Sequence, residues 1–367
     1  MRNPKERIIV SLILLIFIFA LFSVIVSSTD EIRLSARSAS LYEPETRSFL
    51  YEKNADIKLP MASTTKIMTA LVVLENSLST DKVTVGKNAV GVEGSSLYLK
   101  EGETLSVENL LYGLMLRSAN DAGVALAEAI GGSIEGFADM MNARAEKIGL
   151  KSTHFTNPHG LDNKEHYTTA KELAIISAEA LKNEKFKEIV STYKKEIVNG
   201  DGEKRLVVNH NKLLKLYDGA IGVKTGFTKK SGRCLVGAAE RNGLTFISVT
   251  IDAPNDWNDH EKLFDYGYSH MEKRVLAKFG DFSYKIPVID GNKNEITVEN
   301  KDEFYKIMNI SDQEIHSFVK MSRYVCAPVK EGDILGKVVF KQGNKVIGEI
   351  NLYALENVDK VKKHRLF

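Results

Sequence analysis

The sequence predicts an α+β domain built on an antiparallel sheet, followed by a small β-rich domain. Three observations carry this prediction. Patterns typical of strands lie near both ends of the first 270 residues, with helical patterns between them. From about residue 275 the pattern changes to short alternating stretches separated by turn residues. The length of 367 residues also exceeds that of a typical single domain.

Composition and charge exclude several classes of protein. Hydrophobic residues make up 43% and charged residues 27%, which is typical of an ordered globular chain and not of a disordered one. The net charge of +2 provides no field that would recruit nucleic acid, so no nucleic-acid partner is expected. The cysteines Cys234 and Cys326 are too few and too far apart for a disulfide scaffold or a CxxC metal site. Both are expected to be buried thiols.

The N-terminus predicts export. Three basic residues precede an apolar run over residues 8–26. The run is about 19 residues long, which exceeds the usual core of a cleaved signal and approaches the length that spans a bilayer. Cleavage after Ser28 and retention as a membrane anchor both stay open. Either outcome places the rest of the chain at the outer face of the cytoplasmic membrane or in the cell-wall space.

The first elements after this segment are a hairpin and a buried helix. Two short runs, over residues 36–42 and 47–53, flank the turn-like sequence Glu43-Pro44-Glu45-Thr46. Pro60 then precedes a stretch that is apolar on nearly every side over residues 67–74. Such a pattern is typical of a helix in the middle of a domain.

Further helical patterns fill the middle of the domain. The first repeats apolar residues every three or four positions, the next two end at glycines, and the last opens with a capping box from Thr169 to Glu172. The expected ranges are about 106–118, 121–130, 134–148 and 169–183.

After Gly219 the period changes to that of strands. Apolar stretches follow at residues 220–228, 233–240 and 244–252. The last two are separated by a turn that contains Asn-Gly, the strongest short hairpin signal. The chain is therefore divided into a signal peptide or anchor, an α+β domain, a β-rich domain and a basic tail, at residues 1–28, 31–272, 275–355 and 356–367.

Three short motifs stand in order in the α+β domain. Ser63-Thr-Thr-Lys66 begins the buried helix, Ser118-Ala-Asn120 lies between two helices, and Lys224-Thr225-Gly226 lies on a strand. Each has a structural alternative when taken alone, as helix caps for the serines and as a close backbone approach for the glycine. The ordered set matches the motifs of penicillin-recognising serine enzymes.

The placement of Ser63 favours a nucleophile. Three residues apart on a helix, Ser63 and Lys66 share one face, so the amine can take the proton of the hydroxyl. Lysine acts as a base only when neutral, so its pKa of about 10.4 has to be lowered by burial and nearby positive charge. The apolar helix would supply the burial, and Lys224 the charge. Backbone N–H groups at the helix start could stabilise an oxyanion.

The sequence resembles a known family, the serine D-Ala-D-Ala carboxypeptidases, which are low-molecular-mass penicillin-binding proteins. The resemblance spans nearly the whole chain and implies the fold shared by serine β-lactamases and penicillin-binding proteins, with a helical subdomain beside the sheet and the family's accessory domain behind it. It is carried by PMASTTKIMTAL, LRSANDAGVALAE, NPHGLDNKEHYTTAKELA and DGAIGVKTGFTKKSGRCLVGAA.

The resemblance implies a two-step acyl transfer to water. Ser63 attacks the carbonyl between the two terminal D-alanines of a peptidoglycan stem peptide, with Lys66 as general base and Ser118 as a proton relay to the leaving amine. Water then hydrolyses the acyl-enzyme, and the loss of D-alanine limits cross-linking. β-Lactam antibiotics acylate the same serine. No metal and no organic cofactor is implied.

The resemblance also assigns the substrate-binding residues. Asn120 lines the cleft, Lys224 holds the terminal carboxylate by charge, and Thr225 donates a hydrogen bond to it. The backbone N–H groups of Ser63 and of Phe227, just past Gly226, form the oxyanion hole.

Two departures from the family pattern concern the site and the membrane. Phe227 stands where some members have a histidine, so a titration carried by that imidazole is missing. The end of the chain carries no convincing amphipathic helix, so any membrane attachment shifts to the N-terminal segment. His159, in the NPHGLD loop, resembles a family position near the active site, and a structural loop histidine is its alternative role.

Two other functions compete with the carboxypeptidase. A class A β-lactamase shares the three motifs but needs a glutamate and a positioned water for deacylation. Glu165 is the only glutamate near that loop, in a sequence that matches the carboxypeptidases better. An anchored wall-binding protein without activity is the second alternative, and the intact Ser63, Lys66 and Lys224 argue against it.

Overall fold

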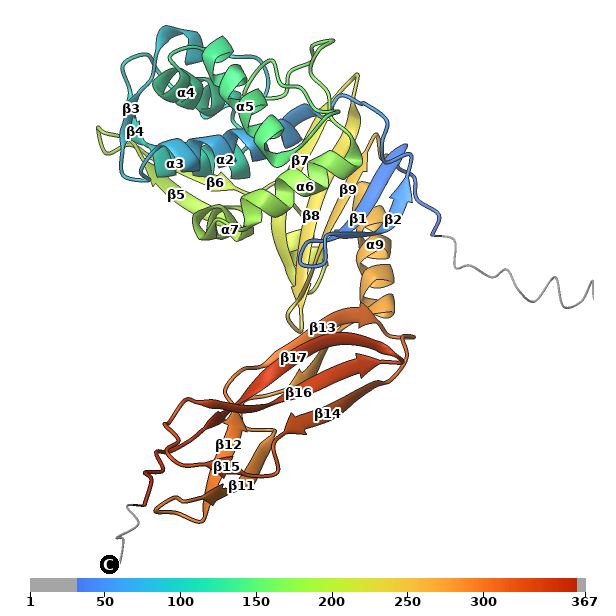
Figure 1. Ribbon diagram of the computed structural model, residues 1–367. Helices are drawn as coiled ribbons and strands as arrows, with labels where there is room; N and C mark the ends of the chain where they lie inside the picture. Colours follow the sequence, from blue (N-terminus) through green and yellow to red (C-terminus); the bar gives the residue numbers. More distant parts are fainter. Residues whose placement is uncertain (1–31, 362–367) are drawn as a thin grey trace, which may run out of the picture. The chain divides into compact units, whose positions relative to one another are not determined.

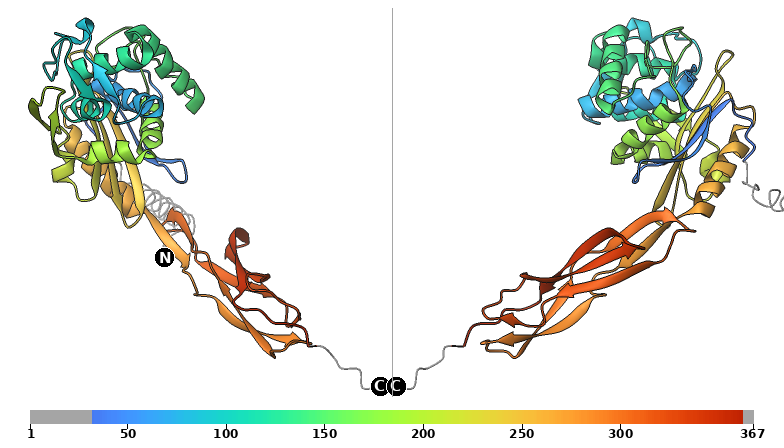
Figure 2. Two further views of the ribbon diagram at one scale, coloured as in Figure 1. Left: turned by 90° about the vertical axis from the view of Figure 1, so that its left-hand side faces the viewer. Right: turned by 45° about the vertical axis from the view of Figure 1, so that its right-hand side comes forward.

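The structure is a computed structural model that describes residues 32–361 (Figures 1 and 2). The predicted signal peptide or anchor lies outside the described residues, as do residues 362–367 of the basic tail. The compact unit described below begins at Ala36. No helix within residues 32–361 combines the length and apolar composition needed to cross a bilayer.

A five-stranded antiparallel sheet forms the centre of the first domain. Its strand order is β2-β1-β9-β8-β7, so strands from the two sequence ends of the domain pair directly. The predicted antiparallel sheet is confirmed, and β7 is an edge strand. The bounds are β1 Ser38–Glu43, β2 Ser48–Lys53, β7 Ala220–Thr228, β8 Gly232–Arg241 and β9 Leu244–Ile251.

Helices cover both faces of this sheet. On β1, the Ser40 hydroxyl donates to the carbonyl of Ala170 in α6, whereas Leu41 packs against Gly267 in α9. Successive strand residues point to opposite faces, so α6 and α9 lie on opposite sides of the sheet (Figure 2). The helices are η1 Ala62–Thr65, α2 Lys66–Asn76, α3 Val107–Leu116, α4 Asn120–Gly131, α5 Ile134–Ile148, α6 Ala170–Leu181, α7 Glu184–Ser191, α8 Leu213–Leu216 and α9 Asp256–His270.

The helical subdomain surrounds α2. Residues 66–73 of this helix are all buried, and α3, α4, α5, α6 and α7 pack around it (Figure 1). The predicted buried helix is confirmed. The sequence did not predict α7, α8 or α9. In α9 the buried positions include Asp256, Asp259 and His260 as well as apolar residues, so the apolar period of a helix is weak there.

Several local features form as the sequence predicts. The turn between β8 and β9 consists of Asn242 and Gly243 with φ of 52° and 71°, as a two-residue hairpin turn requires. Gly132 and Gly149 cap α4 and α5 in the left-handed conformation, with φ of 75° and 91°.

The capping box that opens α6 forms only in part. The Thr169 hydroxyl accepts a hydrogen bond from the Glu172 N–H. The Glu172 carboxylate accepts hydrogen bonds from the N–H groups of Lys151 and Ser152. This side chain therefore ties α6 to the loop that follows α5.

The second domain is built of strands, as predicted. β10 and β13 form one pair, and six strands form a sheet in the order β14-β16-β17-β12-β11-β15. Cys326 lies on the edge strand β15 and is exposed, so the expectation of two buried thiols is wrong for Cys326 and right for Cys234. The bounds are β10 Met271–Ala277, β11 Ser283–Ile289, β12 Glu295–Asn300, β13 Phe304–Asn309, β14 Ile315–Met321, β15 Val325–Cys326, β16 Ile334–Gln342 and β17 Lys345–Ala354.

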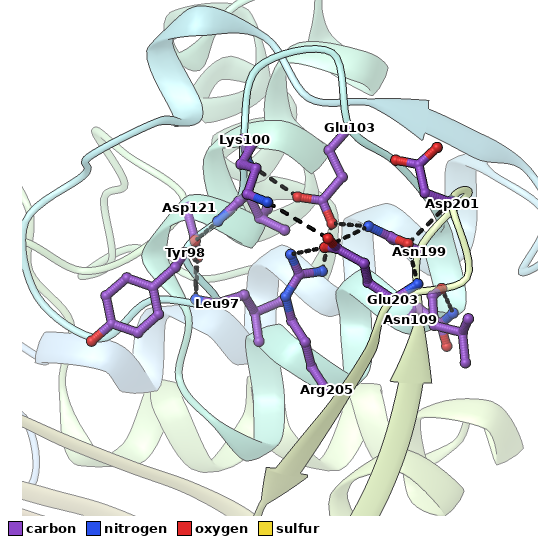
Figure 3. A network of polar contacts seen from close by, with 12 residues as sticks. Leu97, Tyr98, Lys100, Glu103, Asn109, Asp121, Asn199, Asp201, Glu203 and Arg205 are labelled. Atoms are coloured by element: carbon purple, nitrogen blue, oxygen red, sulfur yellow. Dashed lines mark hydrogen bonds and ion pairs between the residues drawn. The ribbon is translucent and has the colours of Figure 1, made fainter.

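Two small hairpins complete the first domain, and a buried carboxylate joins them. They are β3 (Lys82–Thr84) with β4 (Thr104–Ser106), and β5 (Lys194–Val198) with β6 (Lys204–Val208). Just before β4, the carboxylate of Glu103 accepts hydrogen bonds from Arg205, at 2.5 Å, and from Asn199, at 2.9 Å (Figure 3). Its side chain is only 4% exposed.

A second buried carboxylate fixes the loop that leads to Glu103. Asp121 in α4 accepts hydrogen bonds from the N–H group of Leu97 (Figure 3), from that of Leu99 and from the Ser96 hydroxyl. The carbonyl of Ser95 in turn accepts from the N–H of Asn120. The loop is therefore attached to the start of α4, where the second sequence motif lies.

We expect Glu103→Gln to lower the free energy of unfolding by about 2–3 kcal/mol at pH 7, because Arg205 then loses its buried counter-charge. Burial raises the pKa of Glu103, but the hydrogen bonds from Arg205, Lys100 and Asn199 outweigh it and hold this pKa below 4.5. The stabilisation is present above the unfolded pKa and is lost as the pH falls through the lower folded value.

Urea unfolding of the wild type and of Glu103→Gln between pH 3 and pH 8 measures the difference in their free energies of unfolding. Glu203→Gln, which removes a carboxylate that is 53% exposed, should change stability by less than about 1 kcal/mol. A difference between wild type and Glu103→Gln that does not shrink toward pH 3 would contradict the assignment.

Candidate active site

The first motif lies in a tight turn directly before α2. Ser63 is part of η1, and the preceding Ala62 has φ of 47°, a left-handed conformation that is uncommon for a residue other than glycine. Two neighbouring glycines approach this turn closely. A Cβ at Gly160 would lie 1.9 Å from the Ala62 carbonyl oxygen, and one at Gly226 would lie 3.0 Å from the Ser63 nitrogen. A side chain at Gly160 would therefore collide with the turn, and one at Gly226 would be tightly packed against it.

Lys66 contacts three residues from different segments of the chain. Its Nζ lies 2.9 Å from Ser63 Oγ, 2.7 Å from Asn120 Oδ1 and 2.6 Å from the carbonyl oxygen of His159. The side chain is fully buried. Asn120 Nδ2 donates to the carbonyl of Glu93 at 2.6 Å, which turns Oδ1 toward Lys66. The predicted pair of Ser63 and Lys66 is therefore in hydrogen-bond contact.

The surroundings of Lys66 favour the neutral amine. Burial lowers its pKa well below the ordinary value, and the charge of Lys224 lowers it further, against an opposing effect of Asp121. A neutral amine has two N–H donors and one lone pair. Since Asn120 Oδ1 and the His159 carbonyl oxygen can only accept, they take the two N–H groups. The lone pair is then left for the hydroxyl proton of Ser63.

His159 contributes its backbone to this arrangement. Its ring Nδ1 accepts a hydrogen bond from the Leu161 N–H. Burial, with the charges of Lys66 and His166, lowers the pKa of His159 to about 3, so the ring is neutral near pH 7. The imidazole ring of His159 therefore has the role of a structural loop histidine, while its backbone carbonyl contacts Lys66.

Three side chains that the sequence analysis missed hold the loop of His159 against α2. Thr69 donates to the carbonyl of Pro158 at 2.7 Å, and the Thr65 hydroxyl lies 2.7 Å from His166 Nε2. Thr65 and Thr69 are four residues apart on an otherwise apolar helix, and this spacing is the signal that could have pointed to a polar partner.

The third motif forms the opposite side of the site. Lys224 on β7 is buried, and burial lowers its pKa to about 7. Its Nζ lies 2.9 Å from the carbonyl oxygen of Thr225. The next residues, Gly226 and Phe227, lie on the cleft surface, and Phe227 is 66% exposed.

A cleft of about 890 Å³ opens over these residues. Ser63, Ser118 and residues 225–227 line it, so residues of all three motifs lie at one cleft, whereas Asn120 and Lys224 are buried and are not among the lining residues. Ser118 lies between α3 and α4 with φ of 62°. Neither motif serine caps a helix, because the cap positions here are Met61, Thr65 and Ala119.

Much of the cleft wall carries no sequence motif. The segment that leads into α8, α8 itself, Arg233 in β8 and the start of α9 contribute to it. Glu165, the residue considered for β-lactamase deacylation, is exposed and is not among the lining residues. The additional lining residues are Ser95, Tyr193, Asn209, His210, Lys212, Lys215, Leu216, Arg233, Pro254, Asn255, Asp256 and Trp257.

The described part of the chain offers no metal site. Within residues 32–361, no group of three or more His, Cys, Asp or Glu side chains is arranged to hold a metal ion.

Comparisons with known proteins find matches for both domains. A family model described as D-alanyl-D-alanine carboxypeptidase matches residues 25–255, and one described as penicillin-binding protein 5, C-terminal domain, matches residues 272–360. The chain is 34% identical to D-alanyl-D-alanine carboxypeptidase DacF of Bacillus subtilis, over 90% of this chain and 88% of that protein. It is 31% identical to DacA of Escherichia coli, over 89% and 84%.

Solved structures of related proteins share the fold. Penicillin-binding protein 5 from Haemophilus influenzae aligns with a TM-score of 0.66 at 29% identity, covering 90% of this chain and 99% of that one. DacD from Francisella tularensis aligns with a TM-score of 0.64 at 29% identity, covering 90% and 95%. The chain therefore belongs to the D-alanyl-D-alanine carboxypeptidase family of low-molecular-mass penicillin-binding proteins, and is a serine-type D-Ala-D-Ala carboxypeptidase of peptidoglycan metabolism.

Proposed function

We propose that Ser63 is the nucleophile of this carboxypeptidase and Lys66 its general base, acting on the terminal D-Ala-D-Ala of peptidoglycan stem pentapeptides. One observation carries the proposal: Lys66 Nζ lies 2.9 Å from Ser63 Oγ, while its other contacts are two carbonyl-type oxygens that can only accept. Lys66 takes the hydroxyl proton as Ser63 Oγ attacks the D-alanine carbonyl. β-Lactams acylate the same oxygen.

The negative charge that develops on the carbonyl oxygen needs donors. The N–H groups of Ser63 and Phe227 serve this role, and the close approach of Gly226 to the Ser63 nitrogen supports it. Ser118, on the cleft surface, passes a proton to the leaving amine. D-Alanine departs, and water hydrolyses the ester in a second step, so no further reactant is needed.

The terminal carboxylate binds on the side of β7. Lys224 holds it by charge, and the Thr225 hydroxyl donates a hydrogen bond to it. Both residues belong to β7, the strand that borders the cleft, and Asn120 lies at the start of α4 with its side chain on Lys66. A cation in this position favours substrates with a free terminal carboxylate.

The site of action is the cell-wall space or the outer face of the cytoplasmic membrane. Residues 1–28 export the chain and hold it at the membrane if they are not cleaved. Removal of the terminal D-alanine there leaves fewer pentapeptides for cross-linking.

Release of D-alanine from diacetyl-Lys-D-Ala-D-Ala by residues 29–367 tests the proposal. We expect Ser63→Ala and Lys66→Ala each to lower kcat roughly 10⁴-fold or more, because both act in the same step. Neither variant should become labelled by fluorescent penicillin. Thermal unfolding of both variants controls for the fold. Normal labelling of Lys66→Ala would contradict the proposed base.

The low pKa of Lys224 predicts a basic limb in the pH profile. This pKa is lowered to about 7 by burial, so the cation is lost as the pH rises above 7. We expect kcat/KM for peptides with a free carboxylate to fall above pH 7, whereas the corresponding peptide amide lacks this limb. Lys224→Arg keeps its charge and should shift the limb to higher pH. An identical limb with the amide, or in Lys224→Arg, would contradict the role of Lys224.

A further inference from the structure

The peptide group between Ala62 and Ser63 has different neighbours at its two ends. It is planar, so the Ala62 carbonyl and the Ser63 N–H point in opposite directions. A Cβ at Gly160 would lie 1.9 Å from the Ala62 oxygen, whereas a Cβ at Gly226 would lie 3.0 Å from the Ser63 nitrogen. The carbonyl therefore faces the loop of Gly160, and the N–H lies on the side of β7, where the cleft opens.

The direction of this N–H affects the rate of the proposed reaction. We assign the Ser63 N–H to the oxyanion, and such a donor is effective only when it is aimed at the place where the charge develops. The preceding residue, Ala62, has φ of 47°, in the left-handed region. A residue other than glycine keeps this conformation only where its surroundings hold it. The orientation of the peptide group therefore depends on contacts to the Ala62 carbonyl.

A buried side chain holds this carbonyl. Thr65 Oγ1 lies 2.8 Å from the Ala62 oxygen and donates to it. The hydroxyl has a single proton, so it accepts from its other neighbour, His166 Nε2, at 2.7 Å. Thr65 and His166 are 1% and 3% exposed, and neither lines the cleft. The carbonyl is thus connected to a histidine that lies 101 positions further along the chain.

The second nitrogen of the His166 ring determines which way the hydrogen bonds run. His166 Nδ1 accepts from the N–H of Thr156 at 3.0 Å, so the proton of the neutral ring is on Nε2 and is donated to Thr65. Burial, with the charges of His154 and Lys66, lowers the pKa of His166 to about 4, so the ring is neutral near pH 7. The hydrogen bonds therefore run in one direction, from the loop after α5 to the turn before α2.

We propose that His166 and Thr65 are positioning residues that direct the Ser63 N–H at the oxyanion. The proposal rests on the proposed function, in which Ser63 is the nucleophile and its N–H a donor to the oxyanion. A hydrogen bond to the carbonyl fixes the peptide plane and, by polarising the group, strengthens the N–H at its other end. Because neither side chain lines the cleft, the effect is greatest for species that carry negative charge on the carbonyl oxygen, which are the transition state and tetrahedral adducts.

The test uses residues 29–367 with two substitutions that keep the shape of the side chain and remove its hydrogen bonds, Thr65→Val and His166→Phe. We expect each to lower kcat/KM for D-alanine release from diacetyl-Lys-D-Ala-D-Ala about tenfold, which is less than the loss of a whole oxyanion donor. Affinity for a D-boroalanine analogue of the peptide should fall by the same factor, because its tetrahedral adduct places an oxygen on the same donors. The double variant should lose no more than either single variant, since both residues act through one hydrogen-bond chain.

Two further variants separate positioning from general stability. Thr65→Ser keeps the hydroxyl and should restore kcat/KM to within about threefold of the wild type. The matched control is Thr250→Val, which breaks another fully buried Thr–His contact, 3.0 Å between Thr250 Oγ1 and His260 Nε2. Thr250 is outside the cleft lining, so this variant should unfold at a lower temperature and keep its kcat/KM. Thermal unfolding of every variant shows which ones fold, and His166→Phe tests the chain if Thr65→Val does not fold.

Each result decides a separate point. Wild-type kcat/KM in folded Thr65→Val or His166→Phe overturns the inference, as does a loss in Thr65→Ser or in Thr250→Val that equals the loss in Thr65→Val. Losses that multiply in the double variant also overturn it, because the two residues would then act independently. A wild type that releases no D-alanine, or a Ser63→Ala variant that is fully active, overturns the proposed function and this inference with it.

Discussion

The site depends on an amine that is buried without a carboxylate beside it. Lys66 Nζ is surrounded by one hydroxyl and two carbonyl-type oxygens, and the charge of Lys224 opposes its protonation. Charging a lysine in such surroundings costs several kcal/mol, so the proton is held weakly. The packing of the domain keeps water away from this nitrogen and places no carboxylate among its hydrogen-bond partners, so the charge of Asp121 offsets only part of the effect of burial.

Three separate parts of the chain meet at this nitrogen. The helix α2 carries Lys66, the start of α4 brings Asn120, and the loop after α5 brings the carbonyl of His159. Contacts outside the site hold two of these parts in place: Thr69 holds the loop through the carbonyl of Pro158, and Asp121 ties the start of α4 to the segment that contains Leu97. The geometry of one hydrogen-bonded amine is therefore supported by packing over much of the helical subdomain.

The nucleophile turn shows the same dependence on close packing. Ala62 adopts a left-handed conformation, and Gly160 and Gly226 approach it from two directions. A strained residue persists only where its surroundings leave no alternative. The sheet contributes by placing its edge strand β7 against the turn, which also sets the distance between the first and third motifs.

The sequence by itself determined the fold class, the two hairpins of the sheet and the motif residues, because periodicity, capping glycines and the Asn242-Gly243 turn are local signals. It did not show that α9 would bury Asp256 and His260, since buried polar residues weaken the apolar period.

Only the tertiary structure decided that the carbonyl of His159 would contact Lys66, and that Lys212 and Lys215 would line the cleft. Every residue has a backbone carbonyl, so the sequence does not indicate which one will contact Lys66. An exposed lysine likewise gives the same sequence signal whether or not it lines a cleft. The role of these groups depends on residues that are distant along the chain and become their neighbours only when the chain folds.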